Sequence, residues 1–464
     1  MALNKTTPYV LKDTYKYHDG LGNFFQSETY PGAVPLVNNH PQFPPFGTRS
    51  EKISGTSFVG PRHRNLHTYL YRVRPAFFHD EYTPYNHHLE TANPSPAKHL
   101  TPNSYNWPKF QFALDQDSDW TEQRLLGSNG DPAKKEGVSI WVFNINKDME
   151  PNTAFMSLDG EALIVPSVGA LDIQTELGKL LVRQNEFAVI PRGVKYRVTL
   201  PEGKPARGIT LELYQGHFQL PDMGIIGSTG LAHQRDFQIP VAYFDGQFVE
   251  DKNSRDGVVA KAHNGPGWTI IARLNCKLWS AAQETTPFDV TGWQGNLYPY
   301  KYDVARFSYL GNLCWDHHDP SLFVILTAPA YGKAPGTAVV DFAAVGPHWE
   351  ASEDTPWVPW YHRNTMQEFV FPIVNNTDPK FPFNQGRDWA PFGAWLNGSM
   401  IPHGENDEEY KHWQEKDTSR PGRLQDDGIT AGVIEIESPL RLTDWAYNQA
   451  GKNFKNQVSA VFLE

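Results

Sequence analysis

Residues 154–165 read Ala154-Phe155-Met156-Ser157-Leu158-Asp159-Gly160-Glu161-Ala162-Leu163-Ile164-Val165, which places two short apolar runs on either side of an Asp-Gly pair. Such a pair between two apolar runs is a strong short-range signal of a β-hairpin, because both residues tolerate the backbone of a tight turn. The two runs are therefore predicted to be antiparallel strands that pair with each other.

Similar short runs recur on both sides of this stretch, at residues 66–73, 138–143, 171–175, 180–182, 187–190, 196–199, 208–213, 268–274, 307–310, 322–327, 337–342 and 433–437. Short strands separated by turns at intervals of about 8–12 residues are typical of sandwiches and jelly rolls. We expect an all-β-dominated chain with two β domains of jelly-roll or cupin-like type, long loops and few short helices. The last run, 433–437, alternates apolar and charged residues and is expected to be an exposed strand.

The boundary between the two domains is predicted at residue 304. Residues 1–303 are expected to form the N-terminal β domain, in which residues 1–60 wrap over a larger body as an arm. Residues 75–108 have a loop composition and are expected to be disordered or to pack against a partner subunit. Residues 304–464 are expected to form the C-terminal domain and to hold the active site.

Part of the N-terminal domain resembles a cupin barrel. Residues 178–196 resemble the second cupin motif, in which a glycine, an apolar run and Pro-x-Gly precede a metal-binding histidine. Tyr196 stands in the place of that histidine, so this barrel is expected to be a scaffold without a metal.

The charge and the cysteine content limit the classes of function. The 464 residues carry a formal net charge of −11, which argues against nucleic acid and anionic membranes as partners. Cys276 and Cys314 form neither a disulfide framework nor a CxxC zinc site, and they are expected to be buried free thiols. With no apolar leader and no run of about 18 apolar residues, a cytoplasmic protein is expected.

One stretch near the C-terminus suggests a metal site. His362 and Glu368 lie in an aromatic setting, and His403 follows in Pro402-His403-Gly404. Two histidines and one carboxylate can hold one face of a ferrous ion and leave its other positions open. Because the chain has 17 histidines, a chance pair at this spacing is expected, and a structural role for each histidine remains the alternative.

Several stretches, in the same order along nearly the whole chain, resemble the homogentisate 1,2-dioxygenase family. They lie at residues 20–23, 53–58, 69–72, 217–224, 230–232, 235–237, 287–290, 292–293, 299–302, 315–321, 361–369 and 400–404.

This resemblance implies a non-haem iron dioxygenase that inserts O2 into the ring of a 1,4-dihydroxybenzene. It places the Fe(2+) ligands on His362, Glu368 and His403, and the acid/base histidine on His317, with His318 beside it in the substrate pocket. It also implies a homo-oligomer, either a trimer or a hexamer.

The chain departs from the family pattern around the substrate. Val374, Thr377 and Asn397 stand where the family has an arginine, a tyrosine and a histidine, and Trp395 replaces part of a glycine-rich segment. A further family histidine is Gln294. A buried carboxylate needs charged or multiple hydrogen-bond donors. Without those side chains, we expect a substrate that lacks the acetate arm, such as hydroquinone, a methoxy- or alkyl-hydroquinone, or a trihydroxybenzene.

Three alternatives remain open. The chain could be a homogentisate 1,2-dioxygenase with a rebuilt pocket, which forms maleylacetoacetate in Tyr and Phe catabolism. It could be a non-catalytic binding or storage protein of cupin type. It could also be a cupin isomerase or hydrolase that uses a divalent metal without O2.

Overall fold

A computed structural model describes residues 13–36, 42–85, 89–112, 118–222, 232–263, 265–307, 310–311, 323–350, 361–375, 390–404 and 429–452, with parts of 411–424. Strands dominate these ranges, and the α-helices in them are α1 (Leu89–Ala92) and α3 (Asp444–Gln449). The expectation of an all-β-dominated chain with few short helices is confirmed.

Neither α-helix of the described ranges is long and apolar enough to cross a membrane.

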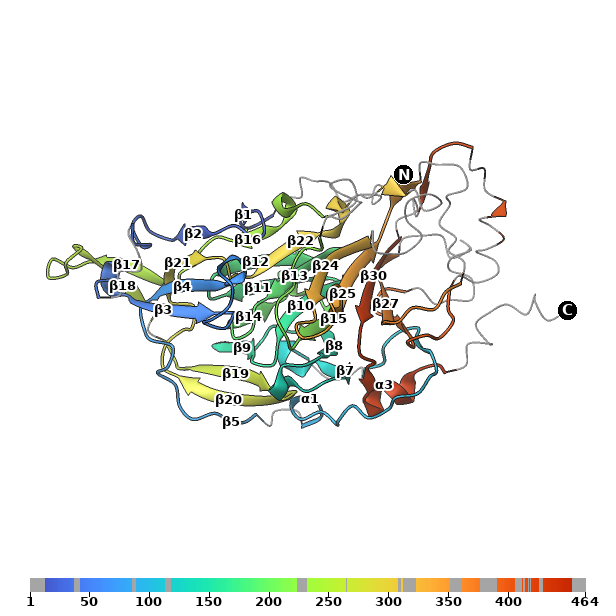
Figure 1. The fold of residues 1–464 in the computed structure, drawn as a ribbon. Helices are drawn as coiled ribbons and strands as arrows, with labels where there is room; N and C mark the ends of the chain where they lie inside the picture. Colours follow the sequence, from blue (N-terminus) through green and yellow to red (C-terminus); the bar gives the residue numbers. More distant parts are fainter. Residues whose placement is uncertain are drawn as a thin grey trace.

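The largest sheet has nine strands and runs through the middle of the molecule (Figure 1). In spatial order its strands are β1 (Tyr17–Asp19), β16 (Gln238–Pro240), β22 (Tyr300–Asp303), β13 (Glu186–Ile190), β10 (Glu161–Val168), β15 (Ala206–Leu213), β8 (Val138–Ile145), β7 (Arg124–Ser128) and β31 (Arg441–Leu442). Its central strands, β10, β15 and β8, are buried along almost their whole length. Nearly continuous burial explains why their sequences read as apolar runs with little alternation.

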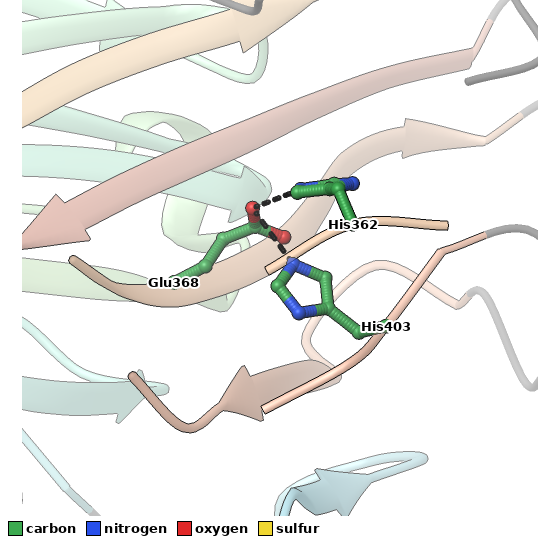
Figure 2. Close-up of side chains that lie close together, drawn as sticks. All are labelled: His362, Glu368 and His403. Atoms are coloured by element: carbon green, nitrogen blue, oxygen red, sulfur yellow. Dashed lines mark hydrogen bonds and ion pairs between the residues drawn. The ribbon is translucent and has the colours of Figure 1, made fainter. Parts of the chain in front are cut away.

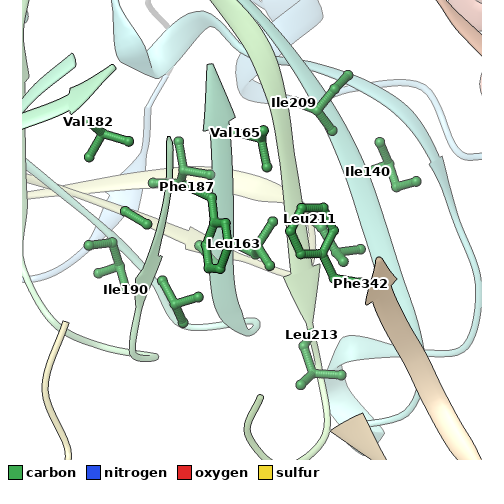
Figure 3. Close-up of a cluster of buried hydrophobic side chains, with 14 of the residues drawn as sticks. Ile140, Leu163, Val165, Val182, Phe187, Ile190, Ile209, Leu211, Leu213 and Phe342 are labelled. Carbon is green, nitrogen blue, oxygen red and sulfur yellow. The ribbon is translucent and has the colours of Figure 1, made fainter. Parts of the chain in front are cut away.

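A seven-stranded sheet forms the second wall of the N-terminal barrel. In spatial order it contains β12 (Gly178–Arg183), β11 (Ala170–Thr175), β14 (Tyr196–Thr199), β9 (Thr153–Ser157), β19 (Trp268–Leu274), β20 (Lys277–Gln283) and β5 (Thr83–Pro84). Val182 of this wall lies near Val165 and Phe187 of the nine-stranded sheet (Figure 3). Tyr196 is buried, and its hydroxyl accepts a hydrogen bond from the indole N–H of Trp120 at 3.1 Å.

The predicted hairpin is wrong, because β9 and β10 belong to different sheets. Strand β9 pairs in parallel with β19, whereas β10 pairs with β13 and β15. The Asp159 carboxylate accepts the backbone N–H groups of Asn275 and Cys276 in the turn between β19 and β20. A Cβ atom on Gly160 would lie 2.5 Å from the carbonyl oxygen of Leu213. The Asp-Gly pair therefore serves a corner where the chain changes sheets, and its acid anchors a turn that lies far away in sequence.

A six-stranded sheet carries the C-terminal part of the chain. In spatial order it contains β24 (Val324–Pro329), β25 (Ala338–Val345), β30 (Ile429–Ile436), β27 (Gln367–Asn375), β28 (Ala394–Asn397) and β6 (Tyr105–Trp107). Strand β30 pairs with β25 on one side and β27 on the other, and all its residues are buried or half-buried, so the prediction of an exposed strand at 433–437 is wrong.

Two short strands within residues 75–108 pair with sheets of their own chain. Strand β5 adds to the seven-stranded sheet next to β20, and β6 forms the edge of the C-terminal sheet next to β28. The expectation of disorder is therefore wrong for these two strands, and contact of residues 75–108 with a partner subunit stays a prediction. Their loop composition reflects short strands separated by turns.

Smaller elements complete the described structure. The four-stranded sheet contains β2 (Phe25–Glu28), β21 (Val290–Gly295), β4 (His67–Arg72) and β3 (Arg49–Ser54). The hairpin of β17 (Gly246–Glu250) and β18 (Val258–Ala262) projects at the left end of the view in Figure 1. Three short strands pair as β23 (Leu310–Gly311), β26 (His348–Glu350) and β29 (Gly422–Leu424). Short 3₁₀ turns occur at Pro45–Gly47, Arg62–Arg64, Trp120–Glu122, Pro132–Lys134, Pro201–Gly203, Gln234–Asp236 and Val304–Arg306.

One hydrophobic core extends across residue 304. Phe342 of β25 lies among Leu163, Leu211 and Phe187 of the nine-stranded sheet (Figure 3). The rings of Phe187 and Phe342 meet edge to face, with centroids 5.2 Å apart. The C-terminal sheet is thus fixed against the N-terminal barrel by buried apolar contact, which is the dominant stabilising term in folding.

Candidate metal centre

Strand β27 divides its side chains between two environments. Phe369, Phe371 and Ile373 are fully buried in the main core. Because successive side chains of a strand point to opposite faces, Glu368 and Val370 project from the other face of the C-terminal sheet. This face carries the candidate metal centre.

Two further side chains reach the same place from short loop segments. His362 and His403 form an isolated β-bridge, in which each backbone N–H donates to the carbonyl of the other residue, at 2.8 and 3.0 Å. Figure 2 shows both imidazole rings turned toward the carboxylate of Glu368. The bridge therefore sets the spacing of the two rings before any ion binds.

The potential ligand atoms of these three residues lie within 4.8 Å of one another, and no other group of this kind occurs in the part of the chain that the structure describes. Glu368 Oε2 lies 3.4 Å from His403 Nε2 and 4.0 Å from His362 Nε2. Two ligand atoms bound at right angles about 2.1 Å from one ion lie about 3 Å apart. The three groups thus fit one divalent ion after a small inward movement of the side chains.

The turn around His403 fixes both its position and its tautomer. The Nδ1–H of His403 donates to the carbonyl of Ile401 at 2.8 Å. With the proton on Nδ1, the lone pair of Nε2 is directed toward Glu368, as a metal ligand requires. A Cβ atom on Gly404 would lie 2.7 Å from Tyr361 Cα, so the close bridge needs a glycine there. This explains the Pro402-His403-Gly404 sequence.

The carboxylate and the imidazole influence each other's protonation. Burial alone would raise the pKa of Glu368, but the hydrogen bond and charge of His403, followed by the charge of His362, lower it below its usual range. Burial alone would lower the pKa of His403, but Glu368 raises it. The site is thus built for a negative carboxylate next to positive charge, which a divalent cation supplies.

Three polar residues next to Glu368 complete the local network. Asn397 Nδ2 donates to Glu368 Oε1 at 3.3 Å. Glu435 of β30 stands directly opposite Glu368 in the strand register, and Asn364 Nδ2 donates to Glu435 Oε2 at 3.0 Å. Burial, together with the charge of Glu368, raises the pKa of Glu435 to about 9. Sequence reasoning missed Glu435 and Asn364, although the charged positions in 433–437 were the available signal.

The other residues predicted to line the substrate pocket lie in different parts of the structure. Trp395 is buried on the same face as Glu368, where it packs with Ala431 and Val370. Val374 follows a register shift in β27 and packs against the main core, so the structure does not bring it to Trp395. His317, His318 and Thr377 lie outside the described residues.

The other predicted residues lie elsewhere in the fold. In the four-stranded sheet, the side-chain oxygen of Gln294 accepts a hydrogen bond from Gln26, and its side-chain N–H donates to the hydroxyl of Tyr71. Cys276 is a free, partly buried thiol, and Cys314 lies outside the described residues.

Comparison with known proteins gives matches over almost the whole chain. The family model described as homogentisate 1,2-dioxygenase N-terminal matches residues 16–304, and the one described as homogentisate 1,2-dioxygenase C-terminal matches residues 305–461. The homogentisate 1,2-dioxygenase of Emericella nidulans is 42% identical over 452 residues, covering 96% of this chain and 94% of that protein. The homogentisate 1,2-dioxygenase of Drosophila melanogaster is 35% identical over 458 residues, covering 97% of this chain and 96% of that protein.

Among solved structures, AerE from Microcystis aeruginosa aligns with a TM-score of 0.29 at 8% identity, covering 72% of this chain and 98% of that one. At that TM-score the likeness of the two structures is weak.

Proposed function

The chain belongs to the homogentisate 1,2-dioxygenase family of ring-cleaving dioxygenases, and we propose that it opens the ring of a 1,4-dihydroxybenzene at a ferrous iron held by His362, Glu368 and His403. The observation that carries this proposal is the convergence of the three ligand atoms within 4.8 Å. Two histidines and one carboxylate with open positions are typical of non-haem Fe(II) oxygenases.

The side chains have separate tasks in this reaction. Bound iron would supply a Lewis-acidic centre with open positions for a phenolate oxygen and for dioxygen. The bridge between His362 and His403 and the hydrogen bond to Ile401 orient the two rings. His317, assigned from its sequence motif, is proposed to take the phenolic proton as a neutral imidazole. Both oxygen atoms enter the product as the bond between the hydroxyl-bearing carbon and its neighbour breaks, so no further reductant is needed.

Homogentisate is the first candidate substrate, ahead of the hydroquinone expected from the sequence. Both relatives described above carry that substrate in their names, at 42% and 35% identity. The product of this reaction would be maleylacetoacetate.

A hydroquinone without the acetate arm is the second candidate. Trp395, Val370 and Ala431 form an apolar wall on the face that carries Glu368. The amide of Asn397, which could otherwise donate to a substrate carboxylate, donates to Glu368. An apolar wall favours a ring without a charged substituent.

Three further properties are proposed with this function. The division into domains of residues 1–303 and 304–464 is supported by the meeting of the two family models at residues 304 and 305. The N-terminal barrel is proposed as a scaffold, because Tyr196 occupies the place of the cupin histidine. We also propose a homo-oligomer, a trimer or hexamer, in the cytoplasm.

Oxygen uptake tests this function. The protein should be reconstituted with Fe(II) under ascorbate and given homogentisate and hydroquinone in parallel. We expect uptake with homogentisate, and we expect Glu368→Ala and His362→Ala to lose both iron and activity to background. Oxygen uptake with hydroquinone but not with homogentisate would identify the hydroquinone as the substrate. Full activity in Glu368→Ala would contradict the metal centre.

A further inference from the structure

Strand register places Asn397 directly beside the metal-binding carboxylate. Asn397 stands opposite Glu368 in the antiparallel pairing of β27 and β28, so both side chains project from the same face of the C-terminal sheet. The preceding residue, Leu396, points to the other face and is fully buried in the main core. Its burial fixes the backbone of β28, and Asn397 therefore has a defined place next to Glu368 before any ion binds.

The two carboxylate oxygens of Glu368 have different neighbours. Oε1 accepts a hydrogen bond from Nδ2 of Asn397 at 3.3 Å. Oε2 lies 3.4 Å from Nε2 of His403 and 4.0 Å from Nε2 of His362, the two contacts drawn as dashed lines in Figure 2. One oxygen of the carboxylate is thus bound by an amide, and the other faces both imidazoles.

The chemistry of the two groups allows only this orientation of the amide. A carboxylate that binds a metal ion accepts hydrogen bonds and donates none, so the NH2 group of Asn397, and not its oxygen, must face Glu368. Asn397 is only 7% exposed, and its Oδ1 atom is buried without a hydrogen-bond partner among the residues that the structure describes. A buried acceptor without a partner is destabilising. The side chain is therefore oriented by its bond to Glu368 and not by the needs of its own oxygen.

We propose that Asn397 is a positioning residue for the metal centre: its amide N–H engages Oε1 of Glu368, so that Glu368 binds the ion through Oε2 alone. This inference rests on the proposed function, because it assumes that Glu368 binds the ion. One carboxylate oxygen and two imidazoles occupy one face of an octahedral ion and leave the opposite face open. Binding through both oxygens of Glu368 would take a position that the substrate or dioxygen needs.

Crystal structures of the anaerobic Fe(II) complexes test this role without any turnover, because they give the distances from the iron to both oxygens of Glu368. In the wild type, we expect Oε2 at about 2.1 Å from the iron and Oε1 beyond bonding distance. Asn397→Leu keeps the approximate size of the side chain and removes its donor. In this variant Oε1 should move to about 2.1 Å from the iron as a second bound oxygen.

Asn106→Leu is the matched control. Asn106 lies in β6 of the same sheet, opposite Trp395, and is 7% exposed like Asn397. The same substitution there removes an equally buried amide that does not donate to Glu368, and it should leave Oε1 unbound. The Tm of each metal-free variant shows whether the two substitutions affect the fold to a similar degree. If Asn397→Leu fails to fold, Asn397→Ala removes the same donor without adding an apolar group.

The possible results separate the positioning role from the proposed function. Iron bound by both oxygens of Glu368 in the wild type would overturn the positioning role and leave the proposed function standing. Iron bound through Oε2 alone in the Asn397 variants, or through both oxygens in Asn106→Leu, would have the same meaning. Wild-type Fe(II) affinity in Glu368→Ala, measured by anaerobic titration, would overturn the proposed function, and the inference with it.

Discussion

Arg72 is a buried charge that is matched by opposite charges at close range. Arg72 is almost fully buried and forms ion pairs with Glu176 at 2.6 Å, Glu51 at 2.7 Å and Asp289 at 3.2 Å. The metal centre is arranged differently, because Glu368 and Glu435 face each other there. Unpaired buried charge is costly, and a cation held by Glu368, His362 and His403 would supply the opposite charge.

His217 shows how such a pair makes stability depend on pH. Its Nδ1–H donates to Glu161 at 2.7 Å, and its Nε2–H donates to the carbonyl of Gly55 at 2.8 Å. Two donating ring nitrogens indicate the charged imidazolium. Burial alone would lower the pKa of His217, but the charge and hydrogen bond of Glu161, with the Gly55 carbonyl, raise it above its usual range.

The raised pKa sets the sign of the prediction. The stabilisation by His217 is complete below the usual histidine pKa of about 6.5, and it is lost as the pH rises through the higher folded-state pKa. His217→Gln should therefore lower the free energy of unfolding by about 3 kcal/mol at pH 6 and by less at pH 9. Thermal melts at both pH values measure the difference.

His263→Gln provides the control, because His263 pairs with Asp245 at 2.8 Å but is 65% exposed. Exposed pairs contribute at most about 1 kcal/mol. An equal loss for His217→Gln at pH 6 and pH 9 would contradict the assignment of a charged imidazole.

Among the strands, β30 connects the fold to the metal centre. Gly432 of this strand lies opposite Phe371 of β27, and Phe371 is fully buried. A Cβ atom on Gly432 would lie 2.5 Å from the tip of that ring. The ring thus occupies the space that any side chain at this position would need.

Gly432→Ala should therefore force β30 and β27 apart. Overpacking of a full core costs about 1–3 kcal/mol, which a thermal melt detects as a lower Tm. Because β27 also carries Glu368, we expect Fe(II) affinity to fall in the same variant. Gly265→Ala is the matched control, since a Cβ atom there meets no atom within 4 Å. Equal Tm values for the two variants would contradict this account of the packing.

The strands could be predicted from the sequence more reliably than their partners. The apolar runs between residues 138 and 213 all proved to be strands, because burial requires apolar side chains. The pairing of β9 with β19 could not be predicted, since it joins residues far apart in sequence. The sequence of β30 alternates apolar and charged residues, which is also the pattern of a strand with one face in solvent. Glu435 is instead a polar residue on a largely buried strand.

The metal centre could likewise be predicted only in part from the sequence. His362, Glu368 and His403 entered one hypothesis because residue types and motif resemblance mark them in the sequence. The place of Glu435 opposite Glu368 depends on strand register, and Asn364, which donates to Glu435, lies 71 residues earlier in the chain. No local pattern connects two such positions.

Across the whole molecule, the two halves of the chain exchange strands. Strand β6 of the N-terminal half forms the edge of the C-terminal sheet, and β31 of the C-terminal half pairs with β7 in the nine-stranded sheet. Trp107 of β6 is fully buried, and its indole N–H donates to the carbonyl of Ala446 at 2.8 Å. The halves are thus expected to unfold together and to depend on this exchange.

Trp107→Ala tests whether the stability of the two halves depends on the exchanged strands. Truncating a fully buried tryptophan costs about 3–5 kcal/mol. Because β6 supports β28, which carries Asn397, Fe(II) affinity should fall together with the Tm. Trp349→Ala is the control, since Trp349 is 50% exposed, and it should change stability by no more than about 0.5 kcal/mol. A wild-type Tm in Trp107→Ala would show that the halves are stable without the exchange.

The strand exchange also has a consequence during synthesis of the protein. Trp107 leaves the ribosome long before Ala446, its hydrogen-bond partner 339 residues farther along the chain. At about 5–20 residues per second, the delay between them is roughly 15 to 70 seconds. Until β28 has been made, the β6 strand has no sheet to join, and a chaperone or a temporary contact would cover its tryptophan during that time.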